Sequence, residues 1–346
     1  MNERRAFLDL WSGVGLVVAN MVGAGVFLSA GFMARELSAG WILVAWIVGG
    51  LLALAGARTY AEASILIPES GGEYRYLSEL IHPSVGFLAG WASLLVGFSA
   101  PVAISAYGAA AFFFAVVGKG EPRLGAVALI ATLTLFHALG LELSKWTQNV
   151  LVIVKGLLVL SFVGLGLAAG THEWPSWVPA SGDAAFAALP FATSLFFVSY
   201  AFSGWNAASY AAGEFRNPER DVPRAMLLGC ADVGVAYLLE NWVLVANLTP
   251  ERASIVFDYE EARVTLGHLV ARDLLGDAGS SIMSLGISLA MISSVSAMSL
   301  VGPRVYAEMA RDGYLPRVFE GKPGAPPRAS VVLQSTLAIL LLYLHT

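Results

Sequence analysis

The stretch Asn20-Met21-Val22-Gly23-Ala24-Gly25-Val26-Phe27 places two glycines near the middle of an apolar run that extends from residue 10 to residue 33. A second apolar run, residues 185–213, contains Phe202-Ser203-Gly204-Trp205-Asn206. Glycine lowers the cost of leaving helical dihedral angles, so both stretches favour an interruption of the helix. The alternative is that these glycines serve close helix packing, because small residues line helix interfaces in membranes.

The overall composition is that of a membrane protein. The chain has 346 residues, of which 57% are hydrophobic and 13% charged, and its mean hydropathy is +0.70. Soluble domains average about 45–50% apolar and about 25% charged residues, so this composition excludes nearly every class of soluble enzyme. A single cysteine excludes a disulfide framework and a cysteine-based metal centre. With Lys+Arg 20 against Asp+Glu 25, no basic surface for nucleic acid is expected.

The apolar runs predict a chain that crosses the lipid bilayer repeatedly. A helix needs about 20 apolar residues to cross a hydrocarbon core of about 30 Å. We expect nine spans, at residues 10–33, 41–63, 84–117, 122–141, 147–169, 185–213, 225–247, 278–302 and 329–346. The last run reaches the C-terminus without a polar flank, so we expect that the chain is truncated, with an unanchored final helix as the alternative.

The basic residues predict the orientation of these spans. If the N-terminus is inside, the inner loops hold 13 of the 20 Lys and Arg residues and the outer loops hold six. Cytoplasmic loops of membrane proteins carry an excess of Lys and Arg. We therefore expect a multi-pass protein of the cytoplasmic membrane with a cytoplasmic N-terminus.

The two interrupted runs are the first and the sixth of the predicted spans. Inverted-repeat transporters bind their substrate at two discontinuous helices in corresponding positions of the two repeats. A free helix N-terminus offers N–H groups and partial positive charge to a carboxylate, whereas unwound carbonyl groups attract an ammonium. A site with both features suits a zwitterion such as an amino acid.

Four parts of the chain carry recognisable motifs. They are GAGVF at residues 23–27, PESGGEYRYL at residues 68–77, FSGWN at residues 202–206 with GEFRNPERDVPRA at residues 213–225, and RVYAEMARDGYLP at residues 304–316. Together they resemble signatures of the amino acid–polyamine–organocation (APC) superfamily of transporters, and in particular its bacterial amino-acid permeases.

The resemblance implies an all-α polytopic membrane protein of the leucine-transporter type, with inverted repeats made of helices 1–5 and 6–10. On this basis the chain is one transmembrane domain over residues 1–346. Residues 10–169 form the first repeat, and residues 185–346 form an incomplete second repeat with helices 6–9. The implied function is secondary active transport of amino acids by alternating access, as proton-coupled symport or exchange. A non-transporting amino-acid sensor and a non-functional fragment of a transporter remain alternatives.

The same resemblance assigns the substrate to the two interruptions. The N–H groups of Ala24, Gly25 and Val26 are expected to hold a carboxylate, and carbonyl groups near Ala201 to Ser203 to hold an ammonium. Phe202 is expected to gate the site, with simple packing as the alternative. The candidate substrate-binding residues are Val22, Gly23, Ala24, Gly25, Val26, Ala201, Phe202, Ser203 and Gly204. A small or apolar substrate side chain is expected, because these positions include no charged residue.

Lys155 lies about halfway along the fifth predicted span, where a bare charge costs at least about 2.5–3.5 kcal/mol. By resemblance it takes the place of the sodium ion of sodium-coupled relatives and ties helix 1 to helices 5 and 8. Loss of its proton would loosen that link, so H⁺ is favoured over Na⁺. Ser293, Ser294 and Ser296 are candidate ion-site residues in the same region. The alternatives are a structural lysine and serines that bond to their own helix.

Other classes of protein find no support in the motifs. The sequence has neither G-x-x-x-x-G-K-S/T nor H-E-x-x-H, so we expect neither an ATP-driven pump nor a metalloprotease, and no cofactor or metal. The charged residues 214–224 are expected to form a solvated loop or an inner latch that pairs with Arg75 or Arg311. Asp232 and Glu240 interrupt the seventh span, and the sequence assigns them no role.

Overall fold

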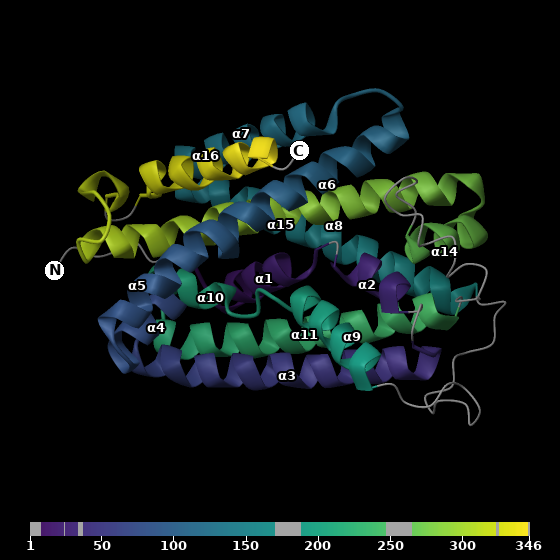
Figure 1. Cartoon of the computed structure of the whole chain (residues 1–346), viewed down its shortest axis with the longest axis horizontal. Helices are drawn as coiled ribbons and strands as arrows, with labels where there is room; N and C mark the ends of the chain where they lie inside the picture. The colour runs from purple at the N-terminus through teal and green to yellow at the C-terminus, as the bar shows by residue number, and fades with distance from the viewer. Residues whose placement is uncertain are drawn as a thin grey trace.

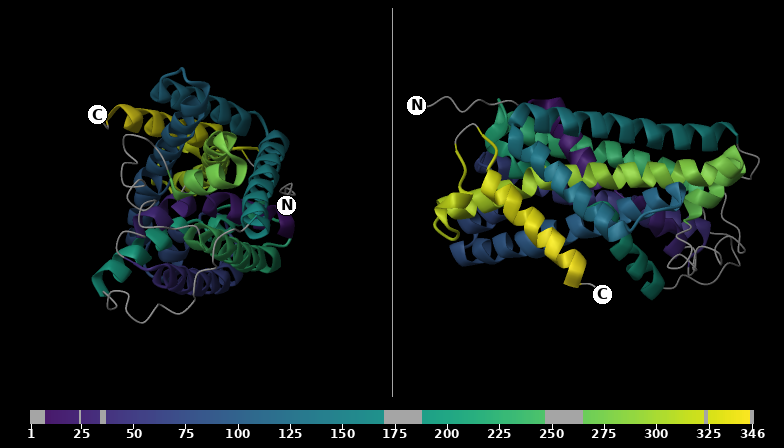
Figure 2. Two further views of the ribbon diagram at one scale, coloured as in Figure 1. Left: turned by 90° about the vertical axis from the view of Figure 1, so that its right-hand side faces the viewer. Right: turned by 90° about the horizontal axis from the view of Figure 1, so that it is seen from above.

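The computed structural model describes residues 8–23, 25–33, 37–169, 188–246, 265–322 and 325–344, and every regular element among them is a helix. The elements are α1 (Leu10–Met21), α2 (Gly25–Met33), α3 (Ala39–Leu66), α4 (Glu73–Leu80), α5 (Pro83–Ala92), η1 (Ser93–Ser99), α6 (Ala100–Val117), α7 (Pro122–Leu139), α8 (Leu141–Ala168), α9 (Ala188–Ala201), α10 (Ala207–Tyr210), η2 (Ala212–Glu214), α11 (Pro218–Ala246), α14 (Leu266–Leu275), α15 (Asp277–Arg311), η3 (Arg317–Phe319) and α16 (Arg328–Leu344). Figures 1 and 2 show long helices side by side along a common axis, with α4 near one end and α14 near the other.

Six helical segments of the described residues are long and apolar enough to cross a membrane. They are Ala39–Leu66, Pro83–Val117, Pro122–Leu139, Trp146–Ala168, Pro218–Ala246 and Asp277–Arg311, and each overlaps one predicted span. The remaining predicted spans contain the shorter apolar helices α1, α9 and α16. The prediction of an all-α protein with several membrane-spanning helices is therefore confirmed.

Polar residues at the ends of the apolar runs determine where the helices begin. The Asp9 side chain accepts a hydrogen bond from the Ser12 N–H (2.9 Å), and the Glu121 carboxylate accepts bonds from two amides in the first turn of α7. Such caps satisfy N–H groups that have no partner within the helix. The charged segment 214–224, for which a solvated loop was one of two expectations, is helical from Pro218 onward. Proline at the first position and acidic residues in the first turn both favour a helix start there.

The helix α15 forms the centre of the bundle. In the most apolar 18-residue stretch of α15, 72% of the residues are buried, whereas the corresponding share for α7 is 22%. It contacts α6, α8, α1, α7, α14 and α16. Six of its serines are buried, and their hydroxyl groups must find partners inside the protein; they are Ser284, Ser288, Ser293, Ser294, Ser296 and Ser299.

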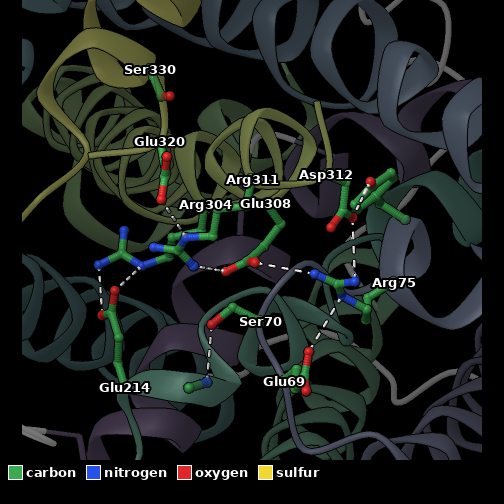
Figure 3. A network of polar contacts seen from close by, with 12 residues as sticks. Glu69, Ser70, Arg75, Glu214, Arg304, Glu308, Arg311, Asp312, Glu320 and Ser330 are labelled. Carbon is green, nitrogen blue, oxygen red and sulfur yellow. Dashed lines mark hydrogen bonds and ion pairs between the residues drawn. The ribbon is translucent and has the colours of Figure 1, made fainter. Parts of the chain in front are cut away.

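A network of ion pairs joins the helices at the α4 end of the bundle (Figure 3). The Arg304 guanidinium donates two hydrogen bonds to the Glu214 carboxylate, at 2.6 and 2.7 Å. The Leu8 N–H donates to the Glu214 carbonyl (3.1 Å), so the residues before α1 are attached to the same point. The alternative to a solvated loop was an inner latch that pairs with Arg75 or Arg311 in the outward-facing state; in this structure Glu214 pairs with Arg304 instead. The bidentate geometry favours Arg304, which approaches from the buried side of α15.

Arg75 and Arg311 instead share a different carboxylate of the same network. Both contact Glu308, at 3.2 Å for Arg75, and Arg75 also lies 3.3 Å from Asp312. Burial alone lowers the pKa of Arg75, but the surrounding carboxylates outweigh it and raise this pKa overall. Burial and the hydrogen bond to Asp312 raise the pKa of Tyr74. The first turn of α4 is thereby fixed to the end of α15.

Small residues on α3 allow close contact with α9 and the residues that follow it. A Cβ atom at Gly49 would lie 2.3 Å from Val198, and one at Gly56 would lie 2.8 Å from the Trp205 ring. The packed Trp205 ring contacts Tyr60 edge to face at 4.9 Å between centroids. A side chain at Gly56 therefore requires either the ring or the helix to move.

We predict that Gly56→Val destabilises the protein by about 1–3 kcal/mol, because it overfills the contact with Trp205. Gly164→Val on α8 is the matched control, since a Cβ atom there meets nothing within 4 Å. Thermal unfolding in detergent should show a lower midpoint for Gly56→Val than for Gly164→Val. Equal midpoints would mean that the α3 contact tolerates the added volume.

Candidate functional site

The two predicted interruptions are present and lie against each other. The first lies between the end of α1 at Met21 and the start of α2 at Gly25, and the second between Ala201 and Ala207. A Cβ atom at Gly25 would lie 3.1 Å from the Ala201 Cα, and one at Gly204 would lie 2.9 Å from the Asn20 backbone. Gly204 also has φ of +108°, which glycine adopts without strain. Glycine is therefore required at the second interruption by both conformation and space.

Side chains from α8 and α15 bind the carbonyl groups that the first interruption exposes. The Lys155 Nζ donates to the carbonyl oxygen of Ala19 (3.0 Å) and to that of Val22. The Ser294 hydroxyl lies 3.0 Å from the Val22 oxygen and 3.4 Å from the Lys155 Nζ. Lys155 is 1% exposed, and among the described residues it has no carboxylate partner. Carbonyl dipoles therefore surround this ammonium.

Tyr237 on α11 joins the two interruptions and was not identified from the sequence. Its hydroxyl oxygen lies 2.7 Å from the Met21 carbonyl oxygen and 3.1 Å from that of Ala201. Since a hydroxyl has one proton, it donates to one of these carbonyls at a time. The local sequence offers one weak signal for this role, a tyrosine within an apolar span, and it does not identify the partners. We refer to this pair of contacts as the Tyr237 clasp.

A cavity of about 580 Å³ opens beside the interruptions. Its volume lies within the usual range of small-molecule sites. Five of the predicted substrate-binding residues line it, namely Gly23, Gly25, Ala201, Ser203 and Gly204. The first N–H groups of α2 have no partner within the helix, so this end of α2 can attract an anion. The cavity thus combines anion-binding and cation-binding backbone groups.

The remaining predicted residues lie elsewhere or outside the described residues. Val22 and Val26 are buried and do not line the cavity, and Ala24 lies outside the described residues. Phe202 is 2% exposed and packs against the rings of Trp46 and Tyr237, at 5.8 and 5.2 Å between centroids. Its ring therefore lies behind the interruption rather than over the cavity.

The three serines of α15 divide between different surroundings. Ser294 lies beside Lys155, as described above. The Ser296 hydroxyl bonds to Gln148 (2.8 Å) and lies 3.0 Å from the His137 Nε2, away from the Lys155 contacts. The buried Ser293 hydroxyl has no hydrogen-bond partner among the described residues. The structure thus brings one of these serines to the lysine.

An acidic side chain that the sequence analysis did not select also lines the cavity. Glu73 accepts a hydrogen bond from the Asn206 Nδ2 (2.5 Å), and its other carboxylate oxygen has no partner among the described residues. Burial raises the pKa of Glu73, and hydrogen bonds from Tyr210 and Asn206 oppose this shift. The expectation that no charged residue faces the site therefore holds for the interruptions themselves but not for the whole cavity.

We predict that Tyr237→Phe lowers the free energy of unfolding by about 1–3 kcal/mol, because two buried carbonyls lose their shared donor. Tyr306→Phe is the matched control: this tyrosine is equally buried, and its hydroxyl has no partner among the described residues. Denaturant unfolding in detergent measures both variants. A loss for Tyr306→Phe as large as that for Tyr237→Phe would contradict the clasp.

Comparison with known proteins agrees with this geometry. The family of amino acid permeases matches residues 8–344. The chain is 29% identical over 327 residues to the b(0,+)-type amino acid transporter 1 of Mus musculus, covering 90% of this chain and 64% of the relative. It is 29% identical over 323 residues to the serine/threonine exchanger SteT of Bacillus subtilis (strain 168), covering 91% and 70%. It is 27% identical over 327 residues to the human large neutral amino acids transporter small subunit 2, covering 90% and 59%.

These relatives are transporters and not enzymes, and the chain spans less than two thirds of the length of two of them. Because the family match extends over almost the entire chain, the protein belongs to the amino acid permease family.

Proposed function

We propose that the protein is a secondary active transporter that carries amino acids across the cytoplasmic membrane by alternating access. The observation that carries this proposal is the pair of adjacent helix interruptions beside a cavity of about 580 Å³. Irregular backbone at membrane depth is tolerated where it lines a cavity or is buried in protein. The names of the relatives, which include an exchanger and two amino acid transporters, support the same class of substrate.

The proposed substrate contacts follow from the two ends of the interrupted helices. The free N–H group at Gly25, which lines the cavity, holds the carboxylate, because the start of α2 carries partial positive charge. The carbonyl groups near Ala201 and Ser203 hold the ammonium. These contacts bind only the carboxylate and the ammonium, which all amino acids share. Selectivity for the side chain therefore comes from other walls of the cavity.

Lys155 is proposed to couple transport to protons. Its ammonium donates to two carbonyl groups of the first interruption, and Ser294 from α15 contacts the same carbonyl of Val22. A deprotonated lysine has fewer donors and no charge, so α1 would be held less firmly to α8 and α15. A fixed ammonium also repels a free cation at the same carbonyls, which favours H⁺ over Na⁺.

The proposed frame is an inverted repeat with helices 1–5 over residues 10–169 and helices 6–9 over residues 185–346, and the N-terminus in the cytoplasm. The excess of Lys and Arg in the loops at that side supports the orientation. On this frame the ion pairs of Glu214 and Arg75 lie at the cytoplasmic side. Proton-coupled symport and exchange make different predictions for a single assay.

The test is uptake of labelled amino acids by the protein in liposomes, with and without a pH gradient and with and without internal amino acid. Stimulation by external acid supports symport, and a requirement for internal substrate supports exchange. Saturable binding without flux would contradict transport and indicate an amino-acid sensor.

We predict that Lys155→Met removes the response to the pH gradient and lowers uptake at least about tenfold, since charge-assisted hydrogen bonds to buried carbonyls are lost. Methionine keeps the length of the apolar stem. Lys119→Met is the matched control, because this exposed lysine lies between α6 and α7, away from the site. An unchanged gradient response in Lys155→Met would exclude the coupling role while leaving transport itself intact.

A further inference from the structure

Glu240 is an ionisable residue inside α11 that the proposed mechanism does not use. It is 0% exposed, and neither carboxylate oxygen has a hydrogen-bond partner among the described residues. It lies in a helix that is apolar enough to cross a membrane. An ionisable residue within a membrane-spanning segment indicates a functional site, because its burial is costly.

The described residues around Glu240 offer it no compensating charge. Near the α14 end of the bundle, the described helices that pack on α11 carry these titratable or charged residues: Lys155 on α8, and His268, Arg272 and Asp273 on α14. None of them forms an ion pair with Glu240. Lys155 binds carbonyl groups, and Arg272 lies 3.4 Å from Asp277. Burial lowers the pKa of His268 to about 4, so this ring is neutral.

An ionised carboxylate without hydrogen bonds in such a place costs far more than a neutral carboxyl group. The neutral form leaves weaker polar groups unpaired, whereas the charged form leaves a full charge unpaired. With these surroundings, burial favours the neutral carboxyl group of Glu240 over the carboxylate.

Glu240 is also placed to act on the Tyr237 clasp. It follows Tyr237 by three residues on the same helix, and side chains three apart on a helix are neighbours. The Tyr237 hydroxyl shares one proton between the carbonyls of Met21 and Ala201. A carboxylate is a stronger acceptor than a backbone carbonyl and would compete for that proton.

We propose that Glu240 is a second proton-binding site of this protein, distinct from Lys155, and that its ionisation opens the Tyr237 clasp. This inference rests on the proposed transport function. When water reaches Glu240, its O–H bond breaks and the proton passes to water. The carboxylate then accepts the hydrogen bond of the Tyr237 hydroxyl, and the two interrupted helices lose their shared donor. Reprotonation of Glu240 restores the clasp.

The first experiment measures amino-acid exchange in liposomes at equal internal and external pH, between about pH 5.5 and 8.5, around the range where buried carboxyl groups and lysines titrate. Glu240→Gln keeps the shape of the neutral side chain. We expect the titration of Glu240 to change the wild-type exchange rate by about fivefold across this pH range. A factor of this size corresponds to the contribution of one net hydrogen bond. Glu240→Gln should lack this component and keep the wild-type rate at low pH within about twofold. Asp232→Asn, which removes an exposed carboxylate from the same helix, should keep the wild-type profile.

A second measurement does not depend on transport. Infrared difference spectra of the purified protein between low and high pH should contain the C=O band of a protonated carboxyl group that disappears on ionisation. This band should be absent from Glu240→Gln and present in Asp232→Asn. A wild type that exchanges amino acids while Glu240→Gln shows the same pH profile and the same infrared band would overturn the inference and leave the transport function standing. A wild type without exchange would refute the transport function, and the infrared titration would still decide whether Glu240 binds a proton.

Discussion

The arrangement of this protein depends on the pairing of backbone groups that two interrupted helices leave free. Hydrocarbon offers no water to an exposed carbonyl, so each must find a donor within the protein. Lys155, Ser294 and Tyr237 supply these donors from α8, α15 and α11. The interruptions are thus attached to three separate helices, and a movement of α1 relative to any of them must break or exchange a hydrogen bond.

The two ends of the bundle are held together by different kinds of interaction. At the α4 end, carboxylates and guanidinium groups form pairs that are partly exposed, such as the contact of Arg75 with Asp312. Pairs of this kind contribute little when solvated and respond to salt. Around the interruptions, by contrast, the donors are buried and few. At the interruptions, each lost bond leaves a buried group unpaired, which adds to the cost of separating the helices there.

The sequence predicted most of the helices because hydropathy and length alone identify a membrane span. It also predicted both interruptions, since glycines at Gly23, Gly25 and Gly204 lower the cost of non-helical backbone. It failed where partners come from distant parts of the chain. The Tyr237 hydroxyl binds carbonyls of two other helices, and no local pattern encodes that contact. Glu214 pairs with Arg304 rather than with Arg75 because of the side-chain geometry within one cluster of charges. Spacing in the sequence does not determine that geometry. The same holds for Phe202, whose ring turns toward Trp46.

The donors at the two interruptions differ in a way that bears on how the helices can move. The Lys155 ammonium has three protons, and with Ser294 it serves the carbonyls of Ala19 and Val22. The Tyr237 hydroxyl has one proton for Met21 and Ala201 together. Among the described residues, the Ala201 carbonyl has no other donor, so this carbonyl depends on a share of a single hydrogen bond. A change at Tyr237 therefore affects the end of α9 before it affects α1, because α1 retains its bonds to α8 and α15.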